Sequence, residues 1–231
     1  MGSFFSIDGP FYKFGSVLAD MMILGLLWFI CSLPVFTMGA STTALFYVMT
    51  KRISDKEGYI TRDFFSSFKS NFKVATLTWL TVLLAAFILF LNINNIDVMG
   101  NMRDWILPFQ YVFVLELSFI TIFMYPLLAR FEMTYFSLIK TAFFMANRHL
   151  LTTILCVVLL LAGAMAVYMM PPVLLIVAGF YAMLASYLFI RVFRKYHPEI
   201  DKDPDYDNLH PSQKTGDDAP AIENDGSVPE K

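Results

Sequence analysis

The sequence predicts an all-α fold, a polytopic membrane helix bundle of about five transmembrane helices plus short amphipathic interfacial helices. The 231-residue chain is 57% hydrophobic and only 16% charged, whereas soluble domains are roughly 45–50% apolar and about 25% charged. Its mean hydropathy is +0.60. Several of its uncharged runs approach or reach about 20 residues, the length that a helix needs to cross the hydrocarbon core. These observations exclude a water-soluble domain, which could not cover so much apolar surface with so few charges.

The chain divides into a membrane domain, residues 1–196, and an acidic tail, residues 197–231. The tail carries ten acidic residues against three lysines. It has too few large apolar side chains to offset the entropy of ordering, so we expect it to be disordered. In the membrane domain the apolar runs predict spans at about residues 14–33, 74–92, 105–129, 150–170 and 173–193. The pair Pro171-Pro172 forces a turn between the last two.

Positive charge predicts the side of the membrane on which each loop lies, because Lys and Arg gather in short cytoplasmic loops. Residues 51–73 contain six basic residues, residues 130–148 contain three, and Arg191, Arg194 and Lys195 follow the last span. The loops that alternate with these contain one basic residue, Arg103. We therefore expect the basic loops and the tail to be cytoplasmic, and five spans then place the N-terminus outside.

Two cytoplasmic segments have the pattern of amphipathic helices. One follows Thr61 and places Phe64, Phe65, Phe68 and Phe72 on one face; the other covers residues 135–146. Each segment leads directly into the next span. They are interpreted as helices bent along the lipid headgroups, or alternatively as docking surfaces for a cytoplasmic partner.

Two acidic residues within the spans are candidate functional residues, since ionisable side chains inside membranes are rare. Glu116 lies roughly midway along residues 105–129. It either accepts an interhelical hydrogen bond from a neighbouring Ser or Thr, or it handles protons or substrate. Asp20 lies in the first span and has the same two interpretations, structural and functional.

The segment Ser32–Phe46 interrupts the apolar pattern with Pro34, Gly39 and the hydroxyl side chains of Ser41, Thr42 and Thr43. After the first span too few residues are left before Lys51 for a comfortable second crossing. The broken stretch Pro34–Thr43 is therefore either an interfacial or packed turn, or a re-entrant element that forms a site. A cytoplasmic N-terminus would require this stretch to help make a second crossing.

Small residues recur at four-residue spacing in the last two spans, a pattern that lets helices approach closely in lipid. We expect close packing of these spans, with self-association through the same face as the alternative. The candidate packing residues are Ala162, Ala166, Ala178, Ala182 and Ser186.

Motifs of known enzyme classes are absent from the sequence, which has no Gly-rich phosphate loop, G-x-S-x-G, H-E-x-x-H or C-x-x-C. The three histidines, His149, His197 and His210, are scattered, whereas a metal site needs converging ligands. We expect no enzymatic activity, no catalytic residues, no cofactor, no metal and no nucleic-acid partner. The expected partner is the lipid bilayer.

Three segments resemble the YesL-like family of small bacterial membrane proteins: LLWFICSLPVFTMGASTTALFYV, EGYITRDFFSSFKSNFKVAT and YPLLARFEMTYFSLIKTAFFMANRHL. The likeness covers about Phe4 to Tyr196. It implies a location in the bacterial cell membrane but transfers no catalytic residues. Members of that family are commonly encoded near carbohydrate uptake genes, including those of ABC-type transporters. The resemblance therefore implies a non-enzymatic accessory role, with transporter subunits as partners. The alternative is a small transporter or channel that uses Glu116 and Pro34–Thr43.

Overall fold

The computed structural model describes residues 10–54, 59–96 and 102–196. These residues form α-helices and short 3-10 helices, with no β-strand among them, which confirms the predicted all-α class. In chain order the elements are α1 (Pro10–Ser32), η1 (Val35–Thr37), α2 (Met38–Ile53), α3 (Ile60–Asn94), α4 (Arg103–Arg130), α5 (Tyr135–Arg148), α6 (Leu150–Met169), η3 (Pro171–Val173) and α7 (Leu174–Tyr196).

Five of these helices are long and apolar enough to cross a membrane: α1, α3, α4, α6 and α7. They coincide with the five predicted spans. The boundaries differ most at α3, which runs without a break from Ile60 to Asn94. The predicted amphipathic segment after Thr61 is therefore the first part of the same helix and not a separate interfacial one. The physical reason is that no Gly or Pro interrupts these 35 residues.

The second amphipathic segment is a separate helix, α5. Its predicted apolar face points into the body, where Leu138, Ala142 and Ala146 are fully buried. The helix ends because His149, which joins it to α6, has backbone angles outside the helical region (φ −116°, ψ 48°). Phe136 and Phe144 remain exposed on the outer face of α5.

The core of the body is built around α2. From Gly39 to Met49 every residue of this helix is buried except Thr42, which is partly buried. Helices α1, α3, α4 and α7 all pack against it. The segment Ser32–Phe46 is thus the end of α1, a single 3-10 turn and the first half of a central helix. This differs from a helix lying on the cytoplasmic surface, which would leave one face open to solvent or headgroups.

Contacts between residues set the relative directions of the first three helices. Trp28 of α1 contacts Thr42 of α2, while Asp20, two turns earlier, contacts Arg52, near the far end of α2. These two helices are therefore antiparallel. The next pair is antiparallel as well, because Lys51 meets Asp63 near the start of α3 and the start of α2 meets the middle of α3.

Helix α7 completes the arrangement. Phe123 of α4 contacts Phe189 of α7, and Phe131, which directly follows α4, contacts Phe193, so these helices run in the same direction. Gly179 of α7 meets α1 in the antiparallel sense. Helices α2, α4 and α7 therefore end toward one end of the body. Helices α1, α3 and α6 begin toward that same end.

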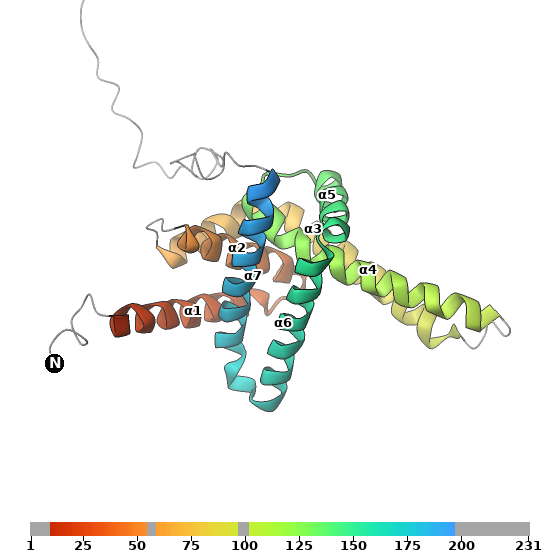
Figure 1. Cartoon of the computed structure of the whole chain (residues 1–231), viewed down its shortest axis with the longest axis horizontal. Coiled ribbons are helices and arrows are strands. Elements are labelled where there is room, and N and C mark those ends of the chain that lie inside the picture. The colour runs from red at the N-terminus through yellow and green to blue at the C-terminus, as the bar shows by residue number, and fades with distance from the viewer. Residues whose placement is uncertain (1–9, 55–58, 97–101, 197–231) are drawn as a thin grey trace, which may run out of the picture.

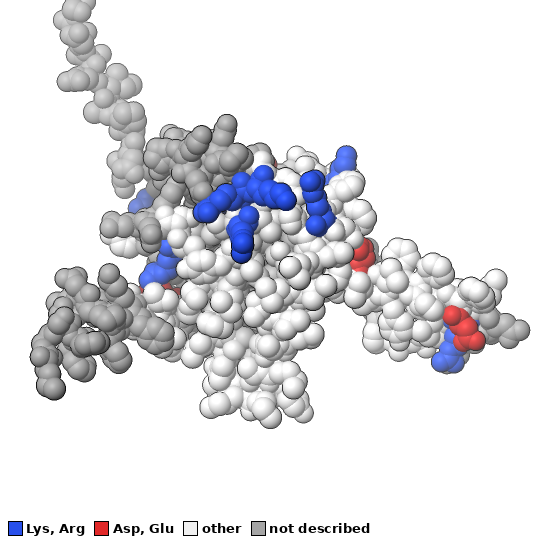
Figure 2. All heavy atoms as spheres, viewed as in Figure 1, with Lys and Arg blue, Asp and Glu red and all other residues white. Residues whose placement is uncertain are grey.

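Basic residues mark that shared end. The last turns of α2, α4, α5 and α7 carry Lys51, Arg52, Arg130, Arg148, Arg194 and Lys195. Figure 2 shows most of the blue side chains along the upper left part of the molecule, with one more at the tip of the α3–α4 hairpin, while the tip of the α6–α7 hairpin is white. The asymmetry of charge predicted from the loops is thus present in the folded helices.

Two hairpins extend from the body in different directions, α3–α4 toward the right and α6–α7 downward in Figure 1. Their outer parts expose large apolar side chains, among them Phe90, Phe109, Phe113, Met165 and Tyr168. Burial of such surface is the main driving force of folding in water, so a chain that leaves so much of it uncovered is suited to a lipid environment.

Candidate functional site

The turn between α1 and α2 holds the hydroxyl cluster that the sequence marks as a candidate site. The Ser32 and Ser41 hydroxyls are 2.6 Å apart. The indole nitrogen of Trp28 donates to the Thr42 hydroxyl at 3.1 Å. Thr37 donates to the carbonyl oxygens of Cys31 and Pro34. These bonds close the hairpin across the break in the helix, where backbone groups would otherwise lack partners.

The hydroxyls on α2 are also bonded within the helix. Ser41 and Thr42 donate to the Met38 carbonyl oxygen, and Thr43 donates to that of Gly39. Each candidate hydroxyl therefore has a protein partner, and Ser41 and Thr43 are fully buried. We interpret Ser41, Thr42 and Thr43 as structural groups that satisfy the hairpin and the start of α2.

The start of α2 packs unusually closely against α3. A Cβ added at Gly39 would lie 2.7 Å from the carbonyl oxygen of Ala75 and 2.7 Å from Cβ of Trp79. The Trp79 indole donates to the carbonyl oxygen of Val35 at 2.7 Å. The glycine in the broken segment is thus required by the distance between the two helices, which explains its place next to Pro34 and the hydroxyls.

Two ion pairs hold the other end of α2. Asp20 of α1 pairs with Arg52, and Lys51 pairs with Asp63 of α3 at 3.2 Å. The side chains of Lys51 and Asp63 are 14% and 17% exposed, so the pair is partly shielded from solvent. Asp20 therefore has a structural partner. The two ion pairs connect the end of α2 to α1 and to α3.

Glu116 lies midway along α4 and is half-buried. Its Oε1 accepts a hydrogen bond at 2.6 Å from the amide of Asn147, near the end of α5. One of the two interpretations of Glu116 was an interhelical hydrogen bond from a Ser or Thr. The structure shows an interhelical bond, but its donor is the amide of Asn147 on the amphipathic helix. Because α5 folds back along α4, it brings Asn147 level with Glu116.

Aromatic rings fill the space between α2, α4 and α7. Phe46 makes edge contacts with Tyr181 and Phe189, and Phe189 lies 4.9 Å from Phe123, centroid to centroid. The Tyr125 hydroxyl on α4 is buried and has no hydrogen-bond partner among the described residues. Sequence reasoning missed Tyr125, although a tyrosine in the apolar second half of a span was a usable signal.

The small residues of the last two helices divide between the inside and the outside. Ala182 and Ser186 are fully buried and Ala178 is partly buried, whereas Ala162 and Ala166 are exposed. The close contact of α6 with α7 is made instead by Gly163, where a Cβ would lie 2.9 Å from a methyl group of Val177. The predicted pairing of the two hairpin helices is present, but Ala162 and Ala166 lie on the other face.

Among the described glycines, the one with the least space for a Cβ is Gly25, at the crossing of α1 and α7. A Cβ on Gly25 would overlap the carbonyl oxygen of Leu175, and one on Gly179 would lie 2.8 Å from the carbonyl oxygen of Met21. Sequence reasoning missed this pair. The single glycine in the middle of the first span was the signal that could have found it.

Within the described residues, no group of three or more His, Cys, Asp or Glu side chains converges as metal ligands. His149 is hydrogen-bonded to Tyr196. The predicted tail, residues 197–231, lies outside the described residues, and His197 and His210 lie outside with it.

Five long apolar helices with basic ends indicate the class of a multi-pass helical membrane protein. Residues 21–93, about a third of the chain, match the model of a family described as "Protein of unknown function, DUF624". The match covers the second half of α1, all of α2 and nearly all of α3. These are the helices joined by the hydroxyl cluster and the two ion pairs. Comparison with curated proteins and with solved structures gives no match.

Proposed function

We propose that this protein is a non-enzymatic accessory component of ABC-type carbohydrate uptake in the bacterial cell membrane. The observation that carries the non-enzymatic role is that the candidate polar side chains of α2 are bonded to other parts of the chain. These side chains hold helices together. The surfaces that remain for binding a partner are the exposed apolar perimeter and the basic end of the helices. The carbohydrate assignment rests on the YesL-like resemblance, with which the match of residues 21–93 is consistent.

The proposed orientation has the basic helix ends and the tail in the cytoplasm. Since α1 begins at the same end as the basic last turn of α2, we propose that the N-terminus is cytoplasmic too. In this topology α2 provides a short second crossing between α1 and α3. The outside location predicted from five spans counted only the long helices. An N-terminal epitope tag should therefore resist protease in intact spheroplasts and be digested after lysis; digestion before lysis would refute this topology.

The accessory role is tested by deletion of the gene and growth on a panel of carbohydrates as sole carbon source. We expect slower growth on one carbohydrate class, restored by the wild-type chain, together with co-purification of the matching transporter subunits in mild detergent. Unchanged growth on every carbohydrate and a partner-free monomer in detergent would contradict the proposal.

The second candidate function is a small transporter or channel. The observation that favours it is the carboxylate of Glu116, which is half-buried at the middle of α4 and bonded to an amide. Purified protein in liposomes would then move sugar, ions or protons down a gradient, and Glu116→Gln would abolish any proton coupling. Absence of flux under all gradients would exclude this function without affecting the accessory role.

A further inference from the structure

The junction between α5 and α6 meets the last residue of α7 in a compact cationic cluster. Nε2 of His149 and the hydroxyl of Tyr196 are hydrogen-bonded at 2.8 Å. The Arg148 guanidinium lies over the Tyr196 ring, with its Cζ 5.4 Å from the centroid. The His149 and Tyr196 rings also make an edge contact. Three side chains from two separate helical segments are thus fixed against one another.

Two positive charges converge on this cluster. The pKa of His149 is lowered by burial and by the charges of Lys195 and Arg148, so both cations act on one imidazole. In the described part of the chain neither Arg148 nor Lys195 forms an ion pair with an acidic residue. Among the residues that the structure describes, the local field is therefore positive, and it favours an anion.

Arg148 can offer hydrogen-bond donors to an anion. A guanidinium carries five N–H donors, and two of them can bind a phosphate through parallel hydrogen bonds. Arg148 and Lys195 are both exposed. The His149 imidazole and the Tyr196 hydroxyl supply further polar groups beside them.

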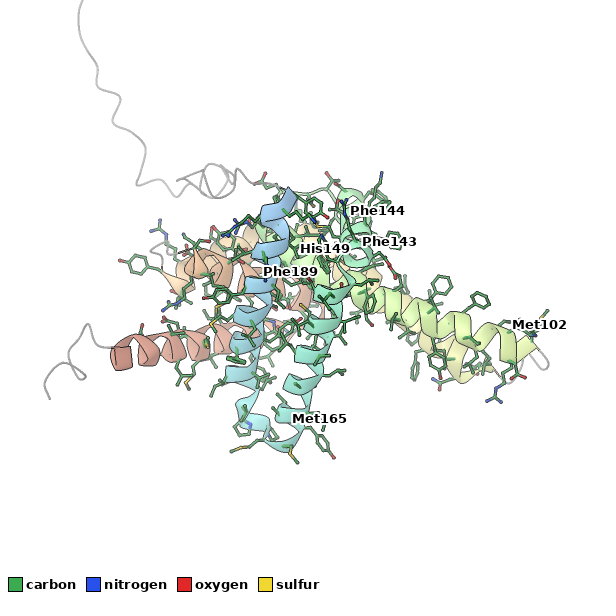
Figure 3. All side chains as sticks on the ribbon, viewed as in Figure 1. Met102, Phe143, Phe144, His149, Met165 and Phe189 are labelled. Atoms are coloured by element: carbon green, nitrogen blue, oxygen red, sulfur yellow. The ribbon has the colours of Figure 1, made fainter. Side chains whose placement is uncertain are left out.

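Apolar side chains adjoin the cations on the outer surface. Leu151 is 84% exposed and Phe144 is 60% exposed, and Phe144 shares a face of α5 with Arg148 at i, i+4. Figure 3 shows Phe144 on α5 and His149 at the junction with α6, and Figure 2 shows basic side chains along the same upper edge. A soluble inorganic anion has no apolar part to contact the exposed leucine and phenylalanine. A phospholipid has both a phosphate and acyl chains.

We propose that Arg148 and Lys195, supported by His149 and Tyr196, form a binding site for the headgroup of an anionic phospholipid, whose acyl chains lie against Leu151 and Phe144. The site lies at the basic end of the helices, where a cytoplasmic-leaflet headgroup would be. The bound lipid would bridge the end of α7 and the α5–α6 junction on the surface of the protein.

The test is native mass spectrometry of the full chain in mild detergent, titrated with phosphatidylglycerol and, separately, with zwitterionic phosphatidylcholine. The site variant is Arg148→Gln with Lys195→Gln. The matched control is Lys69→Gln with Lys73→Gln, which removes two exposed cations from α3. We expect the site variant to weaken phosphatidylglycerol binding about 25-fold, since each cation near an anionic lipid contributes a factor of about 5. The control should change it less than about 2-fold and phosphatidylcholine should bind weakly to all.

Equal losses in the site and control variants, or no loss in the site variant, would overturn the proposal. The single variant Lys195→Gln guards against misfolding, because Lys195 is exposed at the end of α7, and it should weaken binding about 5-fold. Full displacement of the lipid by millimolar inorganic phosphate would identify free phosphate as the ligand and refute the lipid. If Glu199→Gln together with Asp201→Asn raised the affinity for phosphatidylglycerol more than about tenfold, the tail carboxylates would be identified as the occupant of the site. That result would also refute the lipid proposal.

Discussion

The crossing of α1 and α7 provides the sharpest test of the packing, through the substitution Gly25→Ala. The added Cβ would overlap the Leu175 carbonyl oxygen and lie 2.8 Å from its carbonyl carbon. Ordinary van der Waals contact begins at 3.4 Å, so the shortfall to the carbon alone is 3.4 − 2.8, about 0.6 Å. The obstacle is helix backbone, which cannot rotate aside as the end of a side chain can. Helix α1 must therefore move away from α7.

The cost follows from the rigidity of that contact. Overpacking a well-packed core costs typically about 1–3 kcal/mol, and a clash with backbone belongs at the upper end of that range. For a chain of this size each kcal/mol shifts the melting temperature by about 2–4 °C. The higher helix propensity of alanine offsets about 1 kcal/mol of this cost. Gly25→Ala should therefore destabilise by about 2 kcal/mol and lower Tm by roughly 4–8 °C. Gly179→Ala, opposed by the Met21 carbonyl oxygen at 2.8 Å, should lower it in the same direction.

Gly15→Ala is the matched control, because nothing lies within 4 Å of a Cβ at that position of the same helix. Alanine favours a helix over glycine by about 1 kcal/mol, so this variant should raise Tm by roughly 2–4 °C. The measurement is thermal unfolding of the purified chain in detergent, followed by circular dichroism and by size-exclusion chromatography after heating. If Gly25→Ala melted at or above Gly15→Ala, the proposed close approach of α1 and α7 would be refuted.

Four further predictions test individual contacts. Asp20→Asn should destabilise by about 0.2–1 kcal/mol, and a double-mutant cycle with Arg52→Gln should recover a coupling of that size; a coupling of zero would contradict the ion pair. Thr42→Val removes the acceptor of the α1 indole and should cost about 1–3 kcal/mol, measured as Tm, with Thr42→Ser close to wild type. Glu116→Gln keeps an oxygen acceptor for the amide of α5, so its Tm should match wild type, whereas Glu116→Leu should lose about 1 kcal/mol; equal effects would contradict that hydrogen bond. The pKa of His149 is lowered in the folded protein, so the neutral imidazole contributes fully to stability above its unfolded pKa of about 6.5. This contribution is lost as the pH falls through the folded pKa. Below a pH of about 6.5, Tm of the wild type should therefore fall more steeply than Tm of His149→Gln.

The number and place of the long helices were predictable because each depends on a local quantity. A run of about 20 apolar residues is a span wherever its neighbours lie, and the five runs correspond to α1, α3, α4, α6 and α7. The amphipathic face of α5 was predictable for the same reason, since its buried residues recur with the helical period. The basic ends of the helices also follow from loop composition alone.

The role of the broken segment was not predictable in the same way. Pro34, Gly39 and the hydroxyl side chains indicate an interruption of the helix. They do not indicate whether the following helix lies on the surface or in the centre of the body. The outcome depends on Gly39 fitting against Ala75 and Trp79, residues far along the chain. Likewise the partner of Glu116 was an amide on α5, which no pattern within its own span could indicate.

By itself the sequence determined that this is a helical membrane-type chain, how many long apolar helices it has and which of their ends are basic, because hydropathy and charge act locally on each segment. Only the tertiary structure decided that α2 is the central helix, that Asp20 and the α2 hydroxyls have structural partners, and that Gly25 and Gly179 set the crossing of α1 and α7. These features depend on how closely separate backbones approach. In lipid, where apolar surface alone gives no preference among helix pairs, that approach is set by small residues and by hydrogen-bond partners distant in sequence.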